Sequence, residues 1–230
     1  MRTLPPSPSL RRAAAATALV LLGAAGASAQ QQAPQAIALP QARHESPMSL
    51  EAALWARHST RTLKPDAVAL ADAGQLLWAA QGKNRPDGHR TAPSAMAVYP
   101  LEVYLVAGSV EGLAAGVYHY RSATHDLVLT QAGDLRAELT AMPGRPPSWA
   151  ATAPLLVVFA ASSDRAARFG PRAERFTSME VGFAAGNLYL QAAALGLGTT
   201  FMASYNDSAM TRALAPGDRA MGVMPVGKPR

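Results

Sequence analysis

Two consecutive strand patterns restrict the fold more than any other feature of this sequence. Residues 116–121 (GVYHYR) and 125–130 (HDLVLT) are separated by a short turn, so they predict a β-hairpin. Strand and helix patterns alternate along the rest of the chain, but a hairpin excludes a sheet wound only from β-α-β units. The sequence therefore predicts an α+β fold, in which helices pack on a mixed central β-sheet.

The remaining elements follow from apolar periodicity and from residues that begin or end helices. Further strands are predicted at residues 98–107, 154–161, 196–203 and 220–227. Ser46 and Pro47 are typical of a helix N-terminus, and the helix that they begin extends to about residue 58. Other helices are predicted between Asp66 and Gly82, at residues 134–142, at residues 176–195 and after Asp207.

The first 29 residues predict a signal peptide. Arg2, Arg11 and Arg12 precede an almost wholly apolar run at residues 13–25, and Ala27-Ser28-Ala29 fits a cleavage site. The paired arginines leave both the Sec and the twin-arginine export routes open, and an uncleaved membrane anchor is the alternative. We therefore expect an exported, periplasmic protein.

The chain after the signal peptide divides into two parts by composition. Residues 30–45 are rich in Gln, Ala and Pro and show no periodicity, which predicts a disordered tether. Residues 46–230 carry all the expected helices and strands, and their length suits one domain with its own core.

Composition limits the chemistry that the chain can perform. It has no Cys, which excludes disulfides, thiolate metal sites and cysteine nucleophiles, and its five His form no ligand pattern, so no metal is expected. Three of the 21 Lys and Arg residues lie in the signal peptide, which has no Asp or Glu, so the net charge falls from +6 to +3 without it. This charge does not indicate nucleic-acid binding. Redox chemistry by such a chain requires a bound cofactor.

Two short segments place polar residues where a ligand could bind. Residues 57–61 (RHSTR) combine two guanidinium groups with two hydroxyl groups at a helix end, a set that suits a phosphate group. The alternative is a solvated helix end whose arginines interact with the helix dipole. Residues 93–95 (PSA) form a turn small enough for the backbone to approach a flat ring, or an ordinary loop before a strand.

A third segment combines the longest helix pattern with the turn after it. Glu180 and Gly182 interrupt an otherwise apolar helix, which indicates either tight packing or a ligand lying against the helix. Gly196-Leu197-Gly198 follows that helix and precedes a strand, the reverse of the order in a dinucleotide-binding fingerprint. The alternative is a core helix with a glycine C-cap.

Taken in order, four segments resemble the FMN-dependent nitroreductase family: RHSTR, RTAPSAMAVYPLEVYLV, MEVGFAAGNLYLQAAALGLG and VMPVGKPR. The resemblance extends from about residue 50 to residue 230. The second segment is most similar to the branch that includes the thiazole- and oxazole-forming peptide dehydrogenases. The resemblance implies the nitroreductase fold, with FMN bound at the interface of an intertwined homodimer.

The resemblance also implies roles for individual residues. The phosphate and ribityl chain of FMN would be held by Arg57, Ser59 and Arg61, with His58 adjacent, and by Lys228 or Arg230. The isoalloxazine ring would lie along Pro93, Ser94 and Ala95 of the partner subunit, with Glu180 and Gly182 near its reactive edge and Leu197 and Gly198 lining the same pocket.

The activity implied by the resemblance is a two-step oxidoreduction in which hydride passes through flavin N5, so no protein nucleophile is required. The substrate would be a small molecule or a peptide, and export favours oxygen or a quinone as the electron acceptor. Ala97 and Tyr99 stand where many nitroreductases have Asn and Gln, and the Lys-Tyr pair common in the peptide dehydrogenases is missing. The alternative is a non-catalytic exported flavin-binding or interaction protein of the same fold.

Overall fold

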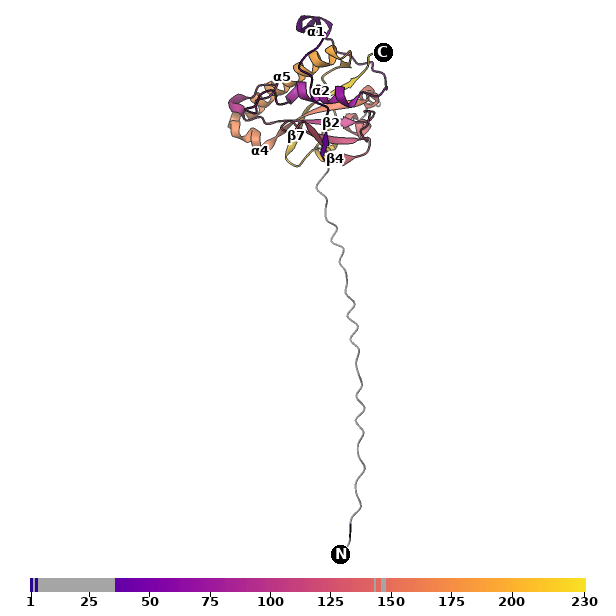
Figure 1. The fold of residues 1–230 in the computed structure, drawn as a ribbon, viewed down its shortest axis with the longest axis vertical. Coiled ribbons are helices and arrows are strands. Elements are labelled where there is room, and N and C mark those ends of the chain that lie inside the picture. The colour runs from indigo at the N-terminus through magenta and orange to yellow at the C-terminus, as the bar shows by residue number, and fades with distance from the viewer. Residues whose placement is uncertain (2, 4–35, 143, 146–147) are drawn as a thin grey trace. The chain divides into compact units, whose positions relative to one another are not determined.

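The predicted hairpin lies near one edge of the central β-sheet in the computed structural model (Figure 1). The structure describes residues 1, 3, 36–142, 144–145 and 148–230. Within these residues, seven strands form one sheet in the order β1-β4-β3-β2-β5-β7-β6. The strands are β1 (Ala36–Ala38), β2 (Leu101–Ala107), β3 (Gly116–Arg121), β4 (Asp126–Ala132), β5 (Leu155–Ser162), β6 (Gly198–Thr199) and β7 (Asp218–Gly227).

Helices cover both faces of this sheet. The α-helices are α1 (Leu50–Ala56), α2 (Leu70–Gln81), α3 (Arg136–Thr140), α4 (Ser163–Ala166), α5 (Ala173–Ala194) and α6 (Asp207–Ala213). Three short 3-10 helices are also described: η1 (Ala95–Ala97), η2 (Trp149–Thr152) and η3 (Ala167–Arg172). Among the described residues, no helix is both long enough and apolar enough to span a membrane.

The α+β class is confirmed, and the sheet is almost wholly antiparallel. Every pairing between the named strands is antiparallel. A mixed sheet was expected, but the parallel pairings in the described part of the chain are two isolated bridges, Ser59–Thr199 and Val68–Val110. A tight turn accounts for the antiparallel pair of β3 and β4, whereas β1–β4, β2–β5 and β5–β7 pair strands that are not consecutive in the chain.

The two faces of the sheet pack into separate apolar clusters. Leu101, Val103 and Leu105 of β2 pack with α2 and α5, whereas Tyr104 and Val106 point to the opposite face, toward α6. Side chains alternate along a strand, so a strand buried on both faces has an uninterrupted apolar sequence. The run LLVVFAA in β5 meets this condition and lies in the middle of the sheet.

The prediction of a disordered tether over residues 30–45 is wrong for residues 36–45. Ala36–Ala38 forms the edge strand β1 against β4, and Leu39 is buried beside Gly74. Gln75 accepts the N–H of Arg43 at 2.7 Å and donates to its carbonyl oxygen at 3.0 Å. The open edge of β4 supplies the backbone partners that make a strand of Ala36–Ala38, a segment too short to be recognised from its sequence pattern. Residues 30–35, and residues 2 and 4–29 of the expected signal peptide, lie outside the described residues.

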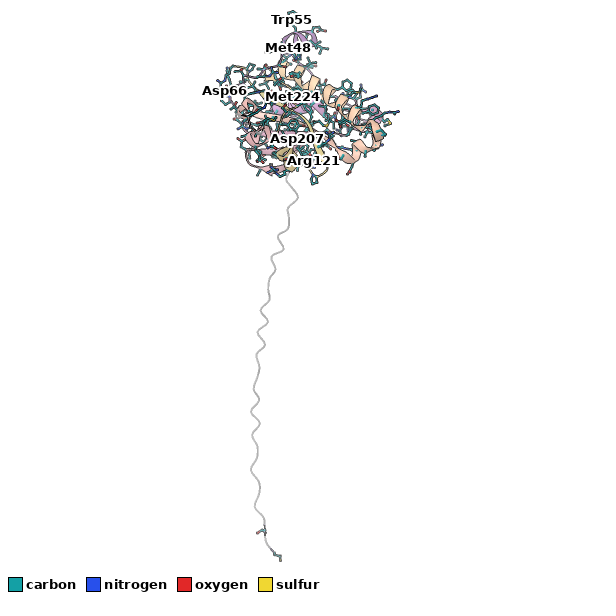
Figure 2. The ribbon with its side chains drawn as sticks, turned by 180° about the vertical axis from the view of Figure 1, so that it is seen from behind. Met48, Trp55, Asp66, Arg121, Asp207 and Met224 are labelled. Atoms are coloured by element: carbon teal, nitrogen blue, oxygen red, sulfur yellow. The ribbon has the colours of Figure 1, made fainter. Side chains whose placement is uncertain are left out.

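The boundaries of two predicted helices shift. The first helix begins at Leu50, because Ser49 rather than Ser46 caps it by accepting the N–H of Ala52 at 3.1 Å. The second begins at Leu70, since Val68 pairs with Val110 in an isolated bridge. The predicted strand at residues 196–203 is reduced to the two residues of β6. Helix α1 carries Trp55, which is 93% exposed and lies at the outer end of the helix (Figure 2).

Candidate functional site

The loop after α1 is held between two segments from the other end of the chain. The N–H of Thr60 donates to the carbonyl oxygen of Thr199 at 2.9 Å, and the N–H of Lys64 donates to that of Lys228 at 2.8 Å. The N–H of Arg230 in turn donates to Thr62 at 3.2 Å. These backbone contacts bring the two predicted phosphate-binding segments, residues 57–61 and 228–230, together with residues 197–199, which include the predicted pocket residues Leu197 and Gly198. The C-terminus accordingly lies at the same end of the domain as α1 (Figure 1).

A cavity of about 170 Å³ opens between these segments. Three predicted site residues line it: Arg57, His58 and Leu197. The other lining residues are Ala56, Thr60, Tyr189, Ala193, Gly196, Thr199 and Pro229. Ser59, Arg61, Gly198, Lys228 and Arg230 are adjacent to lining residues in the chain. The cavity therefore lies where the sequence analysis placed the phosphate group.

Several cationic side chains lie at the end of the domain where the cavity opens. Arg57 is the C-cap of α1, and its extended backbone turns the chain away from the helix axis. Arg57, Arg61 and Lys228 are exposed, and no ion pair among the described residues includes them. Their charges are thus not neutralised by carboxylates of this chain, as an anion-binding site requires.

Gly198 allows β6 to approach the loop. A Cβ atom at this position would lie 2.7 Å from Cγ2 of Thr60, which is closer than carbon atoms approach in proteins. A larger residue would push the loop from β6 and break the contact between Thr60 and Thr199. The glycine that follows α5 therefore fixes the shape of the cavity wall.

Ser94 and Glu180 form a second cluster. The Ser94 hydroxyl donates to Oε1 of Glu180 at 2.6 Å and accepts the N–H of Tyr99 at 2.8 Å. Glu180 is only 2% exposed, and its Oε2 has no hydrogen-bond partner. Burial raises the pKa of Glu180, and the hydrogen bonds from Ser94 and from the Ala95 N–H, together with Arg90, oppose this rise.

The loop that follows Ser94 has an unusual backbone. Met96, Ala97 and Tyr99 all have positive φ, between 50° and 54°, although none of them is glycine. Each such residue costs about 1 kcal/mol or more, so surrounding contacts must hold the loop in place. One such contact is the hydrogen bond that the N–H of Tyr99 donates to the Ser94 hydroxyl. Another is the cation–π contact of Arg90, whose guanidinium carbon lies 4.7 Å from the centroid of the Tyr99 ring. Burial lowers the pKa of Arg90.

Within one chain these two clusters are separate. Glu180 and Tyr189 both lie on α5, nine residues apart, which corresponds to about 13 Å along a helix. Pro93 and Ala95 are exposed beside the second cluster, and Gly182 is exposed on α5. The roles of the second cluster at a flavin ring therefore stay a prediction. The sequence assigned no site role to Tyr189 or to Arg90, although Arg90 begins the segment that contains Pro93, Ser94 and Ala95, because an aromatic residue in an apolar helix and an arginine in a loop are common in structural roles.

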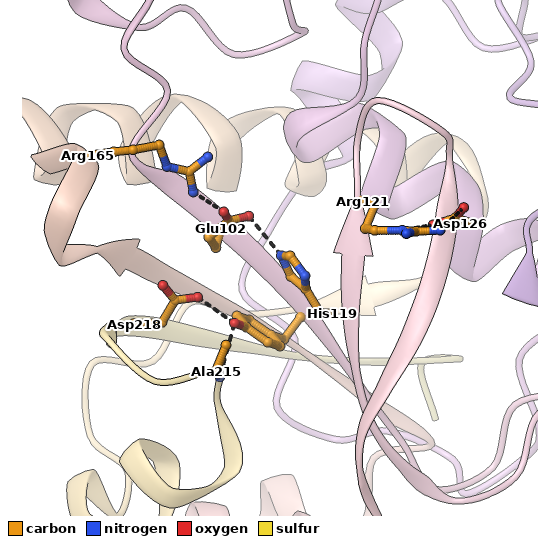
Figure 3. A network of polar contacts seen from close by, with 8 residues as sticks. Glu102, His119, Arg121, Asp126, Arg165, Ala215 and Asp218 are labelled. Atoms are coloured by element: carbon orange, nitrogen blue, oxygen red, sulfur yellow. Dashed lines mark hydrogen bonds and ion pairs between the residues drawn. The ribbon is translucent and has the colours of Figure 1, made fainter. Parts of the chain in front are cut away.

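A third polar cluster lies on the other face of the sheet (Figure 3). Glu102 of β2 pairs with Arg165 of α4 and with Nε2 of His119 of β3, the latter at 2.9 Å. Tyr104 donates to Asp218 and accepts the N–H of Ala215. Burial and the hydrogen bond to Asp218 raise the pKa of Tyr104. These residues belong to the face of β2 that packs against α6, so they are not part of the cavity beside Arg57.

Comparison with known proteins identifies relatives over most of the chain. The sequence profile of the nitroreductase family matches residues 54–228. A Methanocaldococcus jannaschii protein whose name assigns it to the nitroreductases is 35% identical over 182 residues, covering 79% of this chain and 91% of the relative. A Ralstonia eutropha JMP134 protein, also named as a nitroreductase, has a crystal structure that matches with a TM-score of 0.74 at 31% identity, covering 85% of this chain and 90% of that one.

A more distant structure shares the fold. A chain of the E. coli microcin synthetase McbBCD complex matches with a TM-score of 0.64 at 19% identity, over 97% of this chain and 79% of that one. The family profile and the two relatives that are more than 30% identical define the class of the protein as an oxidoreductase. Within that class, the chain belongs to the nitroreductase family.

Proposed function

We propose that the protein is an FMN-dependent oxidoreductase that acts on a small molecule or a peptide. One observation carries the proposal: backbone hydrogen bonds join residues 57–64, 197–199 and 228–230 around a cavity bordered by exposed cations. Membership of the nitroreductase family supports a flavin as the ligand. When bound, FMN supplies the redox chemistry, a hydride transfer at N5 in two half-reactions.

The donor groups at the cavity fit the phosphate of FMN. Arg57 and Arg61 supply forked guanidinium donors, Ser59 a short hydroxyl donor and Lys228 a point charge. Arg230 already donates through Nε to the carbonyl oxygen of Leu63 at 3.1 Å, so its remaining guanidinium nitrogens are fixed in direction. Leu197 and Gly198 would close the side of the cavity toward the ribityl chain.

The ring would lie along Pro93, Ser94 and Ala95 of the partner subunit, with Glu180 and Gly182 near its reactive edge. The buried pair of Ser94 and Glu180 keeps this turn in one position. We propose a homodimer because α1 and α5 expose apolar side chains, among them Leu54, Trp55 and Phe183. Such faces on one subunit are typical of protein interfaces.

The test is FMN retention in paired variants. Arg57→Ala combined with Arg61→Ala is expected to abolish FMN retention, because each guanidinium bonds a doubly charged phosphate. Arg85→Ala combined with Arg168→Ala removes two exposed arginines that do not line the cavity, and is expected to retain FMN. The measurement is the flavin absorbance of the purified proteins after gel filtration. Full retention in the first pair would discard the phosphate assignment.

Reduction separates the enzyme from the alternative, a non-catalytic flavin-binding or interaction protein. A flavin absorbance that bleaches anaerobically with a reductant, and returns with an acceptor, supports the enzyme. A colourless protein that cannot be reconstituted with FMN supports the alternative.

We further propose that the protein is exported to the periplasm after cleavage of residues 1–29. Nicotinamide cofactors are scarce there, so a substrate would lose a hydride and a proton. Oxygen or a quinone would gain both, giving hydrogen peroxide or a quinol. Cell fractionation with N-terminal sequencing tests export, and a screen of donors and acceptors tests the direction of electron flow. Turnover only with NADH or NADPH as donor would contradict this direction.

A further inference from the structure

Tyr189 connects three segments of the candidate site through its hydroxyl group. The side chain comes from the C-terminal part of α5 and lines the same cavity as Arg57. Its oxygen accepts the N–H of Phe201 at 2.7 Å and lies 3.4 Å from the hydroxyl oxygens of Ser59 and Thr200. One side chain therefore joins α5, the loop after α1 and the residues after β6.

The ring of Tyr189 also contacts the principal cation of the cavity. The guanidinium carbon of Arg57 lies 5.3 Å from the ring centroid, within the range of a cation–π interaction. Burial alone would raise the pKa of Tyr189, but its hydrogen bonds with Ser59, Thr200 and the Phe201 N–H, together with Arg57, lower it. Two of the side chains expected at the phosphate, Arg57 and Ser59, are therefore in contact with Tyr189.

We propose that Tyr189 is the positioning residue of the phosphate-binding loop, and that it sets the preference of the protein for FMN over unphosphorylated riboflavin. The inference rests on the proposed function. Tyr189 acts through Arg57 and Ser59 and is not itself required to touch the phosphate. An exposed arginine and serine are otherwise free to rotate, so fixing them before the ligand arrives reduces the entropy lost on binding.

Two ligands that differ only in the phosphate group separate positioning from packing. Replacing a residue that merely supports the fold would weaken the binding of FMN and of riboflavin equally. Replacing a residue that orients the phosphate donors would weaken the binding of FMN alone. The ratio of the two dissociation constants is therefore the quantity to measure, by quenching of flavin fluorescence on the full purified protein.

Two substitutions divide the contributions of hydroxyl and ring. Tyr189→Phe removes the hydrogen bonds and keeps the ring under Arg57, so FMN affinity is expected to fall by about threefold to tenfold. Tyr189→Leu removes both, and a loss of about tenfold or more is expected. Riboflavin affinity is expected to stay within about twofold for both variants, because riboflavin has no phosphate group for Arg57 and Ser59 to bind.

The control and the coupling test use residues already described. Tyr118→Phe also removes a buried tyrosine hydroxyl, which donates to the carbonyl oxygen of Ala114 at 2.8 Å, and the ratio should not change. In an Arg57→Ala background, Tyr189→Leu should cost less FMN affinity than it does alone, because part of its effect passes through Arg57.

The outcomes distinguish the inference from the function on which it rests. A wild-type protein that binds no FMN would overturn both. A wild-type protein that binds FMN, together with Tyr189 variants that keep the wild-type ratio, would overturn the inference and leave the proposed function standing. Equal losses for both ligands would also overturn it, since they indicate packing. If Tyr189→Leu does not fold, Tyr189→Phe, which changes no volume in the core, carries the test.

Discussion

At the scale of single residues, Glu102 joins two partners from different elements, Arg165 of α4 and His119 of β3 (Figure 3). Burial lowers the pKa of His119, and Arg121 lowers it further, while Asp218 and Asp126 oppose this shift. The charge of Glu102 is already balanced by Arg165, so it stabilises an imidazolium less than a lone carboxylate would. The lowered pKa favours the neutral imidazole, whose Nε2 lies 2.9 Å from Oε2 of Glu102.

This arrangement predicts a pH dependence of stability. The folded-state pKa of His119 lies below the unfolded value, so the unfolded chain takes up the proton first as the pH falls. The free energy of unfolding should therefore decrease as the pH drops below about 6.5, down to the folded-state pKa. Urea unfolding across this range measures the slope.

The matched variant is His119→Gln, which keeps a hydrogen-bond donor for Glu102 and cannot titrate. It should show a smaller loss of stability over the same pH range. His89→Gln serves as the control, because His89 is exposed and pairs only with its neighbour Asp87. The same slope in wild type and in His119→Gln would contradict the assignment.

The residues of a candidate site can be suggested from the sequence only where its groups are close together in the chain. Arg57, Ser59 and Arg61 lie within five residues, so their types suit either an anion site or a solvated helix end, and the resemblance to the family favoured the anion site. The bond between Ser94 and Glu180 joins residues 86 positions apart, and Tyr189 meets Ser59 across 130 positions. No local pattern encodes such pairs, because the folded sheet brings them together.

At the scale of elements, a two-pronged ion pair closes the hairpin of β3 and β4. Arg121 and Asp126 are opposite each other in the register, and Nε and Nη2 of the guanidinium each lie 2.6 Å from a carboxylate oxygen. The hydrogen bond from Arg121 lowers the pKa of Asp126. The pair fixes the register of the two strands at the turn. A slip by one residue would move the side chains of the slipped strand to the opposite face of the sheet.

Asp126→Asn is expected to destabilise the protein by about 1 kcal/mol at neutral pH, since it removes a charge-assisted pair whose arginine is partly exposed. A carboxyl with a lowered pKa stabilises the fold above its unfolded pKa and loses this contribution as the pH falls. The difference from wild type should therefore shrink as the pH falls below about 4, the ordinary pKa of Asp, as urea unfolding would show.

The control for the hairpin is Asp66→Asn, an exposed carboxylate without an ion pair among the described residues. It should change stability little at either pH. A pH-independent loss in Asp126→Asn would indicate that packing, rather than charge, holds the turn.

Element types were more predictable than their ends. The strand at residues 116–121 is observed with the predicted bounds, because its alternation and turn are local. The predicted strand at 196–203 was wrong in length. Beyond Thr199 only Met202 bridges to Val223 of β7, while the N–H of Phe201 donates to Tyr189.

At the scale of the whole molecule, the outer faces of α1 and α5 predict self-association. Trp55 is 93% exposed and Phe183 is 52% exposed, and Gly182 and Gly186 on α5 leave open space beside Phe183. A helix face of this kind permits close approach of a second apolar surface. We expect a dimer in solution.

Trp55→Ser and Phe183→Ser are expected to weaken the dimer. Each removes about 2 kcal/mol of apolar burial per copy, and a symmetric dimer contains each position twice. For either single variant the dissociation constant should rise by about a thousandfold, as sedimentation velocity over a dilution series would measure. Leu129→Ser, at an exposed apolar position of β4, should leave the dimer intact. A wild-type monomer at all concentrations would refute the proposed interface.

The sequence by itself determined the α+β class, the hairpin and the long helix, because periodicity and turn residues act over a few positions. Through the resemblance to the nitroreductase family, it also named residues in three segments that border the cavity. Only the tertiary structure decided that Ala36–Ala38 pairs with the sheet, that the sheet is nearly all antiparallel and that Tyr189 contacts Arg57. Each of these depends on backbone edges and side chains supplied by distant parts of the chain, and such partners become available only once the chain has folded.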